Sequence, residues 1–150
     1  MNGIKEVQKK QGAVKVALRI QEPLENVITE LKNLIRTYKV PWQLSRIITK
    51  IMVGDEKQRI KLLDELIFAS SAVRSLQSIA YDSDLQNLGT YLDEEFNCLE
   101  SIRRLLLELA QSSNEHEIAA IKADIIDLCD DIKRWISKVK NVTAKVSATF

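Results

Sequence analysis

Apolar side chains recur with a regular rhythm through the last third of the chain. From Ile118 to Val146 they lie alternately three and four residues apart. This spacing keeps one apolar stripe on one side of an α-helix for about eight turns, roughly 42 Å at 1.5 Å per residue. It predicts a long helix, ending near residues 141–145, whose stripe is covered lengthwise by another helix. We call it the C-terminal stripe: Ile118, Ile121, Ile125, Leu128, Ile132, Trp135, Val139, Val142 and Val146.

The first third of the chain predicts two helices. Residues 3–21 form a basic, moderately amphipathic segment that Gly12 weakens, and Pro23 marks a break or a fresh helix start after it. A second apolar face covers residues 24–38. It ends before Pro41, because the residue before a proline is pushed out of the α region.

Three further apolar faces cover residues 42–52, 60–81 and 85–109. A Gly-Asp pair between the first two suits a helix end followed by a new cap, although one helix running straight through also fits the pattern. Asn114 and Glu117 have the spacing of a capping box, so the last helix is expected to begin there.

These elements predict an all-α fold, an antiparallel helical bundle of five or so helices with a long C-terminal coiled-coil-like helix. At 150 residues the chain is expected to be a single helical domain, with residues 1–21 as a basic N-terminal helix that is a candidate for mobility. Only four Gly and two Pro are present and aromatics make up 5 %, which argues against an all-β fold. A hydrophobic fraction of 45 % argues against a disordered chain.

The net charge is +1, but acidic and basic residues are concentrated in different parts of the sequence. Both ends of the chain are basic, while residues 82–100 carry six acids and no Lys or Arg. Such a pattern can steer one copy onto another or pair elements within one copy. The C-terminal bases also suit the negative end of a helix macrodipole. The candidate contacts for nucleic acid or an anionic membrane are Lys5, Lys9, Lys10, Lys15, Arg19, Lys133, Arg134, Lys138, Lys140 and Lys145.

The cysteines and the hydropathy of the chain both indicate a cytoplasmic protein. Cys98 and Cys129 lie beside apolar positions without metal-ligand spacing, which is typical of small apolar residues in a reducing compartment. Lysines interrupt the start of the chain, so no signal peptide is expected, and no apolar run approaches the roughly 20 residues of a membrane span. We therefore expect a cytoplasmic protein.

The sequence contains no recognisable catalytic or metal-binding motif. The one histidine, His116, falls in the first turn of the last helix, without an inferable nucleophile or orienting partner. No nucleophile elbow, phosphate-binding Gly-rich loop or metal-ligand pattern is present. We therefore expect no enzyme activity, no cofactor, no metal and no small-molecule substrate.

Residues 27–74 resemble the core hairpin of ESCRT-III proteins, especially the archaeal cell-division members. The matching residues are Glu30-Leu31, Leu34-Ile35-Arg36, Ile47-Ile48, Lys50, Gly54-Asp55, Arg59, Glu65 and Arg74. The resemblance implies a non-catalytic cytosolic protein that polymerises on membranes, with the basic segment from Lys5 to Arg19 as membrane contact. The chain departs from the family at Pro41 and Asp55, which suggest a broken second helix, and in lacking a proline-rich or leucine-rich motif in the tail.

Two functional interpretations remain open. The first is a non-catalytic assembly or interaction protein, of ESCRT-III-like self-assembling type, in which the C-terminal stripe meets a second copy or a larger complex. The alternative is a small helical subunit of a nucleic-acid-binding ribonucleoprotein, of the kind found in CRISPR effector complexes. That alternative requires the two basic ends to lie together.

Overall fold

The computed structural model describes residues 2–37, 46, 62–77 and 83–148. Within them the chain forms four α-helices and no strand: α1 (Asn2–Thr37), α3 (Leu62–Gln77), α4 (Ser83–Gln111) and α5 (Glu115–Ser147). The all-α class is thereby confirmed for this part of the chain. The helix expected over residues 42–52 lies outside the described residues except for residue 46.

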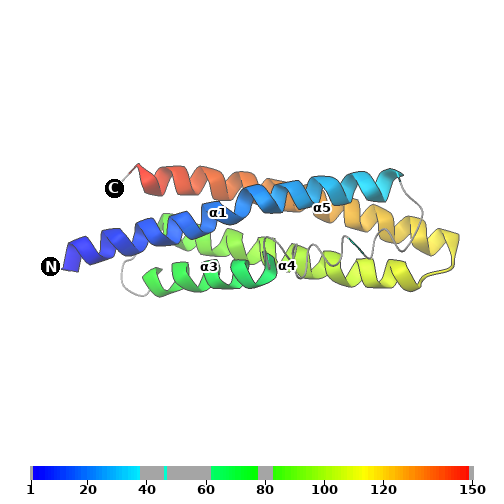
Figure 1. Cartoon of the computed structure of the whole chain (residues 1–150), viewed down its shortest axis with the longest axis horizontal. Coiled ribbons are helices and arrows are strands. Elements are labelled where there is room, and N and C mark those ends of the chain that lie inside the picture. Colours follow the sequence, from blue (N-terminus) through cyan, green and yellow to red (C-terminus); the bar gives the residue numbers. More distant parts are fainter. Residues whose placement is uncertain (1, 38–45, 47–61, 78–82, 149–150) are drawn as a thin grey trace.

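The helices form a closed ring in chain order. Each helix runs antiparallel to the next, and α5 returns beside α1 (Figure 1). α1 contacts α3 and α5, and α4 contacts the same two helices. Because α1 and α5 are antiparallel neighbours, the start of α1 and the end of α5 lie at the same end of the bundle (Figure 1).

α1 continues without interruption through Pro23, so the predicted break there is wrong. A proline inside a helix removes one backbone hydrogen bond and crowds the carbonyl four residues earlier, which costs about 3 kcal/mol. Ala17 and Ile20 before Pro23, and Leu24 and Ile28 after it, are fully buried. Burial of apolar side chains on both sides offsets that cost and joins the basic N-terminal segment to the core.

α5 lies with its apolar face against α1 and α4. Six members of the C-terminal stripe are buried there: Ile121, Ile125, Ile132, Val139, Val142 and Val146. The helices that cover the stripe belong to the same chain. Ile118, Leu128 and Trp135 are half-buried at its margin.

The buried face of α5 is rotated from the predicted stripe. Cys129, Ile136 and Thr143 are buried, although the three-and-four spacing leaves them out. A two-helix seam needs only a narrow stripe, whereas a helix that contacts two neighbours buries a wider face. The rotation therefore follows from the position of α5 between α1 and α4.

A specific contact explains where each end of α5 lies. The Asn114 side chain accepts hydrogen bonds from the backbone N–H groups of His116 at 2.9 Å and Glu117 at 3.3 Å, which confirms the predicted N-cap. The helix continues to Ser147, past the predicted end at residues 141–145, because Val146 is still buried.

Replacing Ile136 with Ala is expected to lower the free energy of unfolding by about 2–5 kcal/mol, because the change leaves a cavity in the core. Urea unfolding followed by circular dichroism measures it. The matched control is Ser137→Ala at the exposed neighbouring position, where a change within about 0.5 kcal/mol is expected. Equal effects of the two substitutions would contradict the observed orientation of α5.

Candidate functional site

Basic residues from the two ends of the chain lie at the same end of the bundle (Figure 1). Lys9 and Lys15 are exposed in the first half of α1, and Lys145 is exposed near the end of α5. We call these three lysines the basic end. Within the described residues none of the three forms an ion pair with an acid. Their charges are therefore available to an anionic partner.

Other predicted contact residues are already engaged within the chain. Lys140 Nζ lies 2.9 Å from Glu25 Oε2, which links α5 to α1. Arg134 pairs with Asp131 one turn earlier on α5. Arg19 and Glu65 lie 3.7 Å apart between α1 and α3.

The remaining predicted bases contribute less to the exposed charge. Lys10 and Lys133 are half-buried. The side chain of Lys5 lies outside the described residues.

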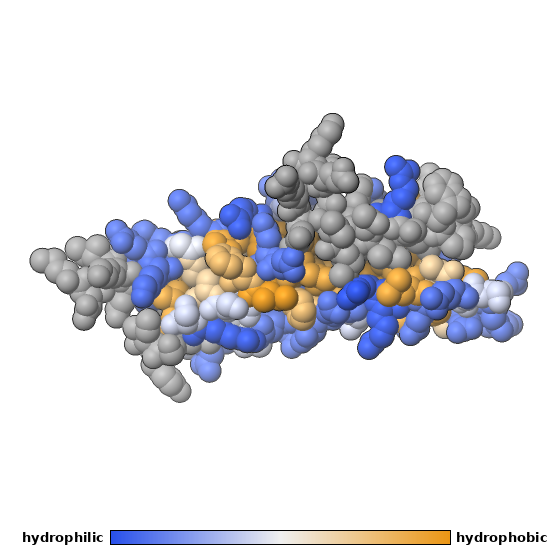
Figure 2. All heavy atoms as spheres, turned by 60° about the horizontal axis from the view of Figure 1, so that its bottom comes forward, coloured by the Kyte–Doolittle hydropathy of each residue, from blue (hydrophilic) through white to orange (hydrophobic). Residues whose placement is uncertain are grey.

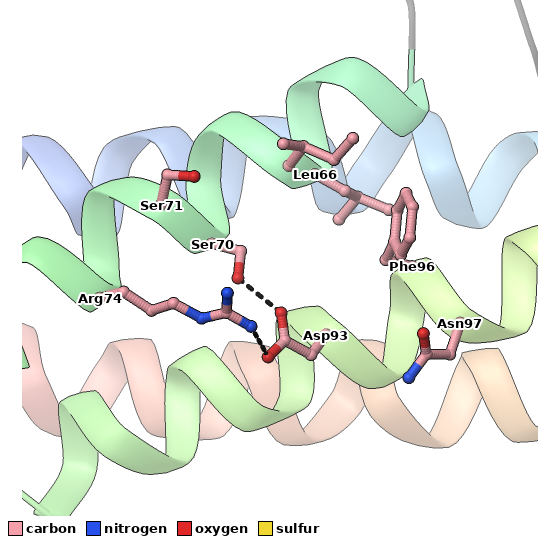
Figure 3. A pocket seen from close by; sticks show the side chains of 8 residues that line it. Leu66, Ser70, Ser71, Arg74, Asp93, Phe96 and Asn97 are labelled. Carbon is pink, nitrogen blue, oxygen red and sulfur yellow. Dashed lines mark hydrogen bonds and ion pairs between the residues drawn. The ribbon is translucent and has the colours of Figure 1, made fainter.

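A hollow of about 340 Å³ opens between α3 and α4 (Figure 3). Its centre is Asp93, whose carboxylate accepts a hydrogen bond from Ser70 Oγ at 2.6 Å and pairs with the Arg74 guanidinium. Arg74 lies toward one end of the hollow, and Leu66 and Phe96 lie toward the other end (Figure 3). The Arg74 and Asp93 charges compensate each other, so the hollow offers no uncompensated charge from this pair.

The described residues that line the hollow include no His or Cys. His116 lies in the first turn of α5 and does not line the hollow. Ser70 Oγ donates to the Asp93 carboxylate, which Arg74 also holds. Among the described residues no group of three or more His, Cys, Asp or Glu side chains could hold a metal ion.

The face of the bundle shown in Figure 2 carries hydrophobic surface between polar side chains. Ile67 and Phe68 on α3 are 50 % and 61 % exposed, and Leu107 on α4 is 46 % exposed. The apolar pattern places Ile67 in the core, and this prediction is wrong. The side of α3 that is buried covers a narrower part of the helix than the apolar residues in its sequence do, and Ile67 falls outside it. None of the described helices is both long and apolar enough to cross a membrane.

A polar pair is buried between α1 and α4. Gln21 is 1 % exposed and Glu95 is 0 % exposed. Gln21 Nε2 donates to Glu95 Oε1 at 3.2 Å and to the Ala17 carbonyl at 2.9 Å. Among the described residues, Gln21 Oε1 and Glu95 Oε2 have no hydrogen-bond partner. A proton on the Glu95 carboxyl gives it an O–H to donate and avoids a buried charge.

Burial controls the titration of this carboxyl and of the two thiols. Desolvation raises the pKa of Glu95 to about 8, and the hydrogen bond from Gln21 opposes the rise. Desolvation, with a smaller contribution from the Asp130 carboxylate, raises the pKa of Cys129 to about 12, and burial also raises the pKa of Cys98. Both thiols are free and buried, as expected of small core residues.

The apolar pattern alone does not predict the buried pair of Gln21 and Glu95, although the sequence carries a signal for it. Glu95 falls at helical spacing between Leu92 and Leu99, and Gln21 falls between Ala17 and Leu24. A polar residue at a core position of a helical pattern is the available sign of a buried polar group.

No known protein family, curated protein or solved structure matches the chain.

Glu95 makes stability depend on pH. In the folded protein the pKa of the Glu95 carboxyl lies above its ordinary value of 4.5, so this carboxyl binds its proton more tightly than it does in the unfolded chain. Between about pH 4.5 and 8 the folded protein therefore holds a proton that the unfolded chain has released. Raising the pH through this window is expected to lower the free energy of unfolding by up to about 1.4 kcal/mol per pH unit.

Chemical unfolding at several pH values tests this expectation. Glu95→Gln should flatten the fall in stability, because it removes the ionisable group, whereas the neighbouring control Glu94→Gln should retain the fall. A wild-type stability that stays constant or rises across this window would refute the effect.

Proposed function

We propose that the protein is a non-catalytic helical subunit that binds nucleic acid through its basic end, as a component of a larger ribonucleoprotein complex. The observation that carries this proposal is that exposed lysines from both ends of the chain, Lys9, Lys15 and Lys145, lie at the same end of the bundle without an acidic partner among the described residues. Lysines neutralise backbone phosphates and release their counterions, independent of sequence.

Self-assembly through the C-terminal stripe is less well supported. The stripe is the one long apolar surface that the sequence offered for a second copy. Most of its members are buried against α1 and α4 of the same chain. The central part of the ESCRT-III-like hairpin, residues 38–45 and 47–61, lies outside the described residues.

A nucleic-acid partner is also favoured over a membrane surface. An interfacial helix needs a large apolar face beside its basic residues. In the described part of α1, Leu18 is the large hydrophobic residue that is well exposed, at 41 %. A single leucine contributes little membrane affinity, whereas phosphate contacts need only the charges.

Neutralising three lysines of the basic end tests the proposal. The variant Lys9→Gln/Lys15→Gln/Lys145→Gln should bind single-stranded RNA or DNA more weakly. The slope of log affinity against log salt should become shallower by about 2, since each lost contact on a single strand removes about 0.7. Fluorescence anisotropy of a labelled oligonucleotide across a salt series measures both quantities.

The matched control removes the same total charge from the other end of the bundle. It neutralises exposed or half-exposed bases near the end of α4 and the start of α5: Arg103, Arg104 and Lys122. This control should leave affinity and salt slope nearly unchanged. Equal losses in both variants, or no binding by the wild type, would refute the proposal. Binding to phosphatidylserine vesicles in place of oligonucleotides would instead support a membrane contact.

A further inference from the structure

A half-buried aromatic pair lies between α4 and α5. The rings of Tyr91 and Trp135 have centroids 5.6 Å apart and planes tilted by 34°. The Lys138 ammonium lies 4.5 Å from the Trp135 ring centroid and 5.6 Å from that of Tyr91. Lys138 is therefore in contact with both rings, and it precedes Lys145 of the basic end by about two turns of α5.

The Lys138 side chain, which lies over these rings, is free to rotate away from them. Tyr91 and Trp135 are only half-buried, and Lys138 is exposed. A rotation of the flexible lysine side chain uncovers the ring face without any change in the helices. The contact between an exposed ammonium and an aromatic ring is weak, and stacking of a nucleobase on an aromatic side chain is stronger. A base can thus replace the ammonium.

The bases of α5 are placed to follow a strand across these rings. Lys138 and Lys145 are exposed seven residues, or about two turns, apart along the helix, so they share one face. Trp135 lies at the edge of that face, toward α4. Lys138 released from the ring can reach a phosphate of the same strand whose base has taken its place.

We infer that Tyr91 and Trp135 form a stacking site for an unpaired base of single-stranded nucleic acid, with Lys138 as the adjoining phosphate contact. This inference rests on the proposed function and narrows it to single strands, because a duplex keeps its bases stacked on one another. Stacking accepts every base, so the site carries little sequence preference.

The test compares a short thymidine oligonucleotide with an abasic oligonucleotide of the same length, which retains the phosphates but has no bases. Titrations follow Trp135 fluorescence in a Trp42→Phe protein, where Trp135 is the one remaining tryptophan. The thymidine strand should quench this fluorescence and bind about tenfold more tightly than the abasic strand.

Variants separate the stacking site from the basic end. Trp135→Leu, or Tyr91→Leu where the tryptophan variant fails to fold, should reduce the tenfold preference to about one. Anisotropy of labelled strands reports the affinity once the tryptophan is removed. Lys145→Gln should weaken binding of both strands by the same factor and leave the preference intact.

The outcomes distinguish the two proposals. Equal affinity of the native protein for the thymidine and abasic strands overturns the stacking site, yet leaves phosphate binding by the basic end in place. An absence of binding to either strand overturns both. A preference for thymidine that persists in both aromatic variants places the base elsewhere and also overturns the stacking site.

Discussion

Burial of the apolar face of α5 is the constraint on which the rest of the structure depends. That face is isoleucine- and valine-rich, and it needs a helix along each side. α1 and α4 fill these places, and both run antiparallel to α5 where they flank it (Figure 1). The ion pairs Lys32–Asp130 and Lys140–Glu25 lie along the α1–α5 boundary. Lys32 is half-buried and the other three side chains are about half exposed. Ion pairs in contact with solvent add little stability, so aliphatic burial supplies most of the free energy.

The same packing places a carboxyl where water cannot reach it. Glu95 faces α1 because the spacing of the leucines around it fixes the buried side of α4. Gln21 supplies a hydrogen bond from α1, but two oxygens of the pair have no partner in the described part of the chain. Burying a polar group without full compensation costs free energy, and the surrounding apolar core offsets that cost. Protonation of the carboxyl reduces it, which couples the fold to pH.

Charge at the surface follows from the chain path. Bases from both ends of the sequence lie at the same end of the bundle because α1 and α5 are antiparallel neighbours (Figure 1). Acids in α4 are partly engaged within the bundle, as Asp93 is by Ser70 and Arg74. A chain with a net charge of only +1 therefore carries exposed lysines from both termini at one end. Local potential, and not the total, decides which partners a surface attracts.

The sequence by itself determined the helical class, the extent of the last two helices to within a few residues and most of the buried positions. These features depend on local spacing and on caps such as Asn114, which act within one helix. Only the tertiary structure decided that Pro23 lies inside a helix, that Ile136 is buried in place of Trp135, and that Glu95 and Gln21 meet. It also decided which residues from the two termini share one end. Each of these depends on which neighbouring helix covers a given side, and periodicity within one helix carries no information about its neighbours.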